Sequence, residues 1–141
     1  MGKINLGRVL IGGIVAGIVS DILGYLVDGV LLSDRWAANM KALGHGAFSN
    51  TQLIWFNLIG IAGGIAVIWV YAAIRPRFGA GIQTAVCAGV AVWIIGTLLP
   101  NAAFMSATGL FGRRLTAYTT AGALIEVVAG AIAGAALYKE E

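Results

Sequence analysis

Residues 6–32 read LGRVLIGGIVAGIVSDILGYLVDGVLL, an apolar run that only two acids and one early arginine interrupt. An α-helix rises 1.5 Å per residue, so this run is long enough to cross the ~30 Å hydrocarbon core of a bilayer. Further apolar runs follow at about residues 52–74, 80–105 and 115–138. Short connections make successive helices antiparallel neighbours. The sequence therefore predicts an all-α membrane protein, with residues 1–141 forming one domain, a four-helix transmembrane up-down bundle.

Composition supports a membrane location. The chain is 60% hydrophobic and 11% charged, whereas soluble proteins carry roughly 25% charged residues. Its net charge is +3, but the basic residues are scattered as membrane-flank anchors are, so we expect the lipid bilayer and no nucleic acid as a partner. Five of the nine basic residues fall on the side of the termini: Lys3, Arg8, Arg75, Arg77 and Lys139. This slight excess favours a cell (inner) membrane protein with cytoplasmic termini, although inverted or dual insertion stays open.

Three carboxylates lie within the apolar runs: Asp21, Asp28 and Glu126. A carboxylate near the bilayer centre costs roughly 2.5–3.5 kcal/mol on insertion scales, so such residues are the first candidates for function. Asp21 follows Arg8 by 13 residues and Glu126 follows Arg113 by 13 residues, which is about 20 Å of helix. Because the first and last helices run in opposite directions, we expect Asp21 and Glu126 to lie at similar depth, where they can share a proton or line one cavity.

A structural role is the alternative for each acid. Asp21 and Glu126 can be neutral, hydrogen-bonded groups that fix helix contacts. Asp28 lies nearer the interface, where it can cap a helix or pair with Arg35 or Lys41.

Small residues recur at intervals of three or four in three of the helices. Such rows let helix backbones approach closely in lipid. On the first helix they share a face with both aspartates, so that face is expected to point inward. The predicted packing positions are Gly13, Gly17, Gly24, Gly60, Gly64, Gly122, Gly130 and Gly134. Pro100 is expected to kink the third helix or to loosen its last turn.

The remaining polar residues do not form a recognisable catalytic or metal-binding set. Residues 33–51 form the longest loop, in which Trp36, Met40 and Leu43 recur at helical spacing. Cys87 is the single cysteine and His45 the single histidine, so no metal site, cofactor or catalytic residue is expected. An enzyme that uses His45 with Asp34 is the least supported possibility.

Two stretches carry a resemblance to a known class of protein. Lys-Ile-Asn at residues 3–5 and Tyr-Ala-Ala-Ile-Arg-Pro-Arg-Phe-Gly at residues 71–79 resemble small bacterial four-span membrane proteins of unassigned function. The four-span plan with an acid in the first helix is also similar to that of small multidrug exporters. That likeness implies proton exchange at Asp21, while Glu126 departs from the exporter pattern.

The function expected first is non-enzymatic. A structural or accessory protein would pack through its glycine-rich faces into a homo-oligomer or a larger membrane complex. The alternative is a proton-linked small transporter or channel that uses the intramembrane carboxylates.

Overall fold

Most of the chain that the structure describes is helical. This computed structural model describes residues 3–140 and contains no strand within them. Its elements are α1 (Leu6–Gly24), the π-helical segment η1 (Tyr25–Leu31), α2 (Ser33–Ala42), α3 (Asn50–Phe78), α4 (Ile82–Trp93), the π-helical segment η2 (Ile94–Leu98), α5 (Leu99–Ala107) and α6 (Arg113–Ala135).

Four continuous helical stretches are long and apolar enough to cross a membrane: Leu6–Leu31, Asn50–Phe78, Ile82–Met105 and Arg113–Ala135. Large apolar side chains project outward from each of them. Ile59 is 64% exposed, Ile95 71% and Ile125 64%. Helices that are apolar on their outer faces as well as their inner ones are typical of membrane spans.

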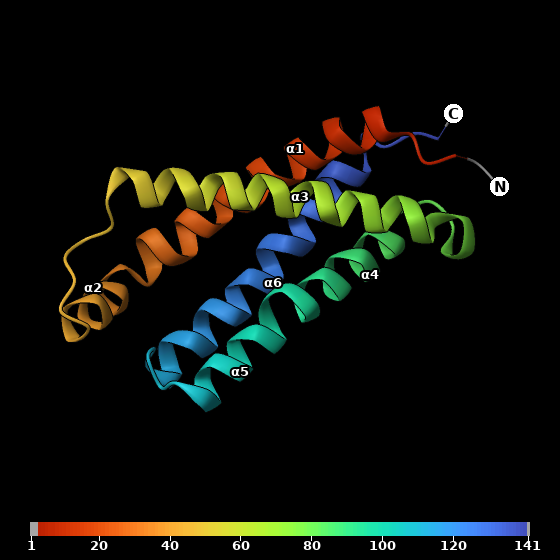
Figure 1. The fold of residues 1–141 in the computed structure, drawn as a ribbon. Helices are drawn as coiled ribbons and strands as arrows, with labels where there is room; N and C mark the ends of the chain where they lie inside the picture. The colour runs from red at the N-terminus through yellow and green to blue at the C-terminus, as the bar shows by residue number, and fades with distance from the viewer. Residues whose placement is uncertain (1–2, 141) are drawn as a thin grey trace.

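The four long helices form a bundle in which α1 packs against α3 and α6, and α4 packs against the same two helices. Both chain ends lie together at one end of the bundle, and α2 lies at the other (Figure 1). At the terminal end the Asn5 N–H donates a hydrogen bond of 3.3 Å to the Tyr138 hydroxyl. The first and last helices are therefore joined at the point where the chain enters and leaves the bundle.

The contact between α1 and α6 follows a regular antiparallel register. Gly12 lies against Gly134, Ala16 against Gly130, and the Ser20 hydroxyl donates to the Glu126 main-chain oxygen at 3.0 Å. Each step of four residues along α1 thus matches a step of four back along α6. A Cβ atom added at Gly12 would lie only 2.7 Å from the Gly134 carbonyl oxygen, so this closeness depends on glycine.

The contact between α1 and α3 is equally close. A Cβ atom added at Gly13 would lie 2.5 Å from the Ile65 Cα atom, and Gly64 packs directly on the backbone of Gly13 and Gly17. All eight glycines singled out from the sequence lie against another helix. These glycines therefore form contacts between helices of the same chain rather than an exposed surface.

Both prolines lie within helices. Helix α3 continues through Pro76 and ends four residues later than predicted, at Phe78. Pro76 lies in the last turn, where its missing N–H costs a single hydrogen bond. The helix ends at Gly79, whose φ of +85° suits glycine.

The loosening attributed to Pro100 lies before that residue rather than after it. The helix is π-helical from Ile94 to Leu98, and the Leu99 N–H donates to the Ile94 carbonyl oxygen five residues back. Helix α5 then continues to Ala107. Because proline has no N–H to offer the carbonyl four residues earlier, the hydrogen-bond pattern shifts in the turn that precedes it.

Candidate functional site

The three intramembrane carboxylates come from two neighbouring stretches, α1 with η1 and α6. Asp21 lies in the last turn of α1, and Asp28 lies in η1. Both share a helix face with Gly24, and Glu126 projects toward that face from α6. The carboxyl group of Glu126, next to Gly24, therefore lies between the two aspartates along the helix axis.

Asp21 points toward α3. Its carboxylate lies directly against the backbone of Gly60, in the space that a Cβ atom at this position would occupy. A glycine singled out as a packing residue thus makes room for an acid. The Asp21 side chain is half-buried in this position.

Glu126 lies in a recess between two other glycines. Its Oε2 atom is 3.3 Å from the position of a Cβ atom built on Gly24, and its Oε1 atom is 3.4 Å from one built on Gly122. The Oε1 atom is buried and, among residues 3–140, has no hydrogen-bond partner. Buried polar atoms are nearly always paired, so this oxygen marks Glu126 as the most unusual residue of the group.

Asp28 contacts α2, at the end of the bundle away from the termini. The indole N–H of Trp36, on α2, donates a hydrogen bond of 3.1 Å to its Oδ1 atom. The predicted pairing of Asp28 with Arg35 or Lys41 is replaced by this contact. Arg35 instead places its guanidinium 5.0 Å from the centre of the Tyr118 ring.

The three acids form one electrostatic group, called here the acid cluster: Asp21, Asp28 and Glu126. Both aspartates lie near enough for their charges to act on Glu126. Within the described chain, no three His, Cys, Asp or Glu side chains are grouped closely enough to hold a metal ion. The chemistry open to the acid cluster is the binding and release of protons, or of a cation by single carboxylates.

An aromatic group that the sequence analysis missed closes the bundle beside Asp28. Trp36 makes edge contacts with Phe48 at 5.7 Å and with Phe111 at 6.0 Å, and Phe48 contacts Phe56 at 5.5 Å. The helical spacing of Trp36 and Met40 predicted the turn that became α2. The aromatic residues that contact Trp36 are far apart in the sequence, so no local sequence pattern predicts these contacts.

Three other polar residues lie away from the acid cluster. His45 is exposed in the loop between α2 and α3, as is Asp34 at the start of α2. Asn101 donates to the Thr120 hydroxyl at 2.8 Å, and so links α5 to α6. The structure therefore brings together the acids but not the proposed His45 pair.

Comparison of the chain with protein-family models, with curated proteins and with solved structures found no significant match.

Proposed function

We propose that the chain is an integral protein of the bacterial inner membrane that crosses the bilayer four times in an up-down arrangement. Its four apolar helices support this proposal, since each exceeds the thickness of the hydrocarbon core. We place both termini in the cytoplasm, because the Arg-Pro-Arg turn at residues 75–77 lies at their end of the bundle.

Proton-linked transport is the activity that the geometry supports best. The observation that carries it is the buried, unpaired Oε1 atom of Glu126. A charged oxygen in such a place is costly, whereas a protonated carboxyl is tolerated. Asp21 and Asp28 share the face of Gly24, next to which Glu126 lies, so the acid cluster offers three carboxyl groups that could hold a proton or a cation.

Release of the proton requires a change in the contact between α1 and α6. Glu126 lies between Gly24 and Gly122, so a small separation of the two helices at these glycines would admit water to the carboxyl. The π-helical segment η1 begins at Tyr25, next to Gly24. π-Helical turns are often found at functional sites, where they ease local rearrangement.

A structural or accessory role is the second candidate. The close approach of Gly12 to Gly134 and of Gly13 to Ile65 leaves little room for a solute path between these helices. In this case the acids would lock helices together. Contacts with other copies or subunits would then use outward-facing residues, because the eight packing glycines are already used within the chain.

Proton flux into proteoliposomes distinguishes the two roles. The parent is compared with Glu126→Gln and Asp21→Asn, and Asp34→Asn serves as a matched control because Asp34 is exposed and outside the acid cluster. Transport predicts that flux is lost in the two cluster variants and retained in the control, with all proteins folded. Absence of gradient-driven flux in the parent contradicts transport and leaves the accessory role.

A further inference from the structure

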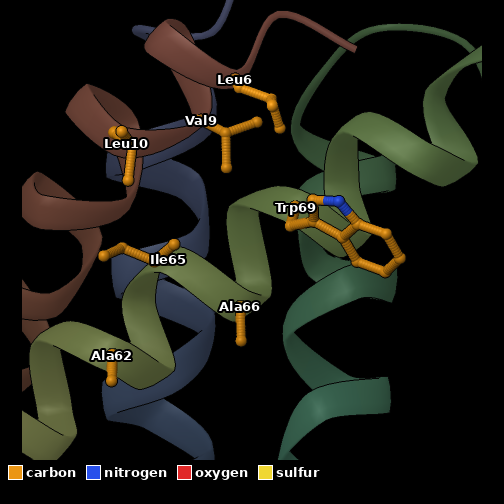
Figure 2. Close-up of a pocket in the computed structure, with 7 residues that line it drawn as sticks. All are labelled: Leu6, Val9, Leu10, Ala62, Ile65, Ala66 and Trp69. Atoms are coloured by element: carbon orange, nitrogen blue, oxygen red, sulfur yellow. The ribbon is translucent and has the colours of Figure 1, made fainter.

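A shallow apolar groove of about 580 Å³ runs along the outside of the bundle between α1 and α3. Its lining comes from the first turns of α1 and from the middle of α3 (Figure 2): Leu6, Val9 and Leu10 with Ala62, Ile65, Ala66 and Trp69. Every lining residue has an apolar side chain. In a membrane such a groove faces acyl chains rather than water.

The groove exists because small and large residues alternate around it. Ala62 and Ala66 present only methyl groups, while Leu6, Leu10 and Trp69 project beside them (Figure 2). The two leucines are 64% and 50% exposed, and Trp69 is 50% exposed. The groove is therefore shallow over the two alanines and bounded by larger side chains on either side. This shape suits a single flexible acyl chain.

The face of α3 that lines the groove also carries a basic residue, Arg77, further along the helix. Residues at intervals of three or four share a helix face, so Ala66 and Trp69 are followed on this face by Ala73 and then Arg77. Ala73 is exposed, and its methyl group is too small to obstruct the face of α3 between Trp69 and Arg77. Arg77 is exposed in the last turn of α3, about 12 Å beyond Trp69 by the helical rise.

Arg77 differs from its neighbour Arg75 in being available to a ligand. Arg75 is half-buried, forms an ion pair of 3.5 Å with Glu140 and lies 5.5 Å from the centre of the Tyr138 ring. Arg77 lies two residues further along α3, which is about 200° around the helix from Arg75. Positive charge at the open end of an apolar groove is complementary to an anionic headgroup joined to an acyl chain.

We propose that this groove binds an acyl chain of an anionic phospholipid from the leaflet next to the termini, with its headgroup at Arg77. The inference rests on the proposed membrane location and is independent of proton transport. The groove fits within one leaflet: its lining on α3 runs from Ala62 to Trp69, about 10 Å of helix rise, and one leaflet is about 15 Å of hydrocarbon.

Brominated lipids test the proposal, because bromine quenches tryptophan fluorescence on contact. The protein is reconstituted in phosphatidylcholine vesicles containing either brominated phosphatidylglycerol or brominated phosphatidylcholine at equal fraction. The Trp69 signal is the difference between the parent and Trp69→Phe. One basic residue near a membrane surface favours anionic lipid about fivefold, and we expect a preference of this size for phosphatidylglycerol at Trp69.

Two variants and two controls locate the site. Arg77→Gln should abolish the headgroup preference, and Ala66→Leu should reduce quenching by filling the groove. Arg114→Gln, at the other end of the bundle, and Ala91→Leu, at an exposed alanine of α4, should change neither. Equal quenching of the parent by the two lipids, an unchanged preference in Arg77→Gln, or unchanged quenching in Ala66→Leu would overturn the proposal. Resistance to alkaline carbonate extraction is measured first, so that failure of membrane insertion is recognised separately.

Discussion

The carboxylate of Asp21 occupies the space beside Gly60 in which a side chain at that position would lie. An acid of α1 and a glycine of α3 thus form a complementary pair. Glu126 lies beside two further glycines at looser distances, with its oxygens 3.3 Å from a Cβ atom built on Gly24 and 3.4 Å from one built on Gly122, where Val27 is closer at 2.6 Å. Glycine in this chain has two uses: some positions bring helices together, and others make room for carboxylates.

Gly60→Ala tests this pairing. The added methyl group would overlap the Asp21 carboxylate, and overpacking of this kind costs about 1–3 kcal/mol. We expect a lower midpoint of thermal unfolding in detergent. Gly63→Ala is the matched control, because a Cβ atom at Gly63 meets open space, and alanine there should stabilise the helix by up to about 1 kcal/mol. Equal effects of the two substitutions would contradict the observed contact.

Trp36→Phe removes the hydrogen bond to Asp28 but keeps an aromatic ring against Phe48 and Phe111. Loss of a donor to a carboxylate costs about 1–3 kcal/mol, and we expect α2 to detach more often from the bundle. Trypsin cleavage after Arg35 or Lys41 should therefore be faster. Trp55→Phe is the control, since Trp55 is 60% exposed, and an unchanged cleavage rate in Trp36→Phe would show that the hydrogen bond does not hold α2.

Thr120→Val probes the link between α5 and α6. The Thr120 hydroxyl accepts from Asn101 at 2.8 Å, and valine keeps the shape while leaving that amide unpaired. We expect a loss of about 1 kcal/mol in the free energy of unfolding. Thr119→Val should cost less, because the Thr119 hydroxyl donates only within its own helix, to Thr116. A double-mutant cycle with Asn101→Ala measures the coupling directly.

Cysteine labelling tests the arrangement in the membrane. In a Cys87→Ser background, Gly46→Cys lies in the exposed loop after α2 and Lys139→Cys lies near the C-terminus. An impermeant maleimide should label position 46 in intact cells and position 139 only after the membrane is disrupted. Labelling of both positions from one side would contradict the up-down arrangement, and the opposite pattern would reverse the orientation but keep the four spans.

The four apolar helices could be predicted because length and hydropathy are local properties of the sequence. Their ends were less predictable. Pro76 reads as a stop, yet a proline in a final turn removes only one hydrogen bond, so α3 continues to Phe78. The segment that forms α2 was recognised from the spacing of Trp36 and Met40, but its length was not.

The acids of the candidate site could be found from the sequence, because charges in apolar helices are conspicuous. Their partners could not. The pairing of Asp21 with Gly60 depends on where α3 crosses α1, and the hydrogen bond from Trp36 to Asp28 depends on how α2 folds back. Helix spacing in the sequence indicates which face a residue shares, whereas contacts between helices depend on the crossing point.

The register of α1 and α6 has a consequence for alignment. Positions 12, 16, 20 and 24 of α1 and positions 134, 130 and 122 of α6 all carry glycine, alanine or serine, so one helix slid past the other by a full turn would again set small residues against small. Glu126 is the bulky exception in the α6 row, and the recess between Gly24 and Gly122 accommodates it. Because the Glu126 side chain fits only at this recess, it favours one of several similar alignments of α1 and α6. Buried polar residues are known to fix the register of packed helices in this way.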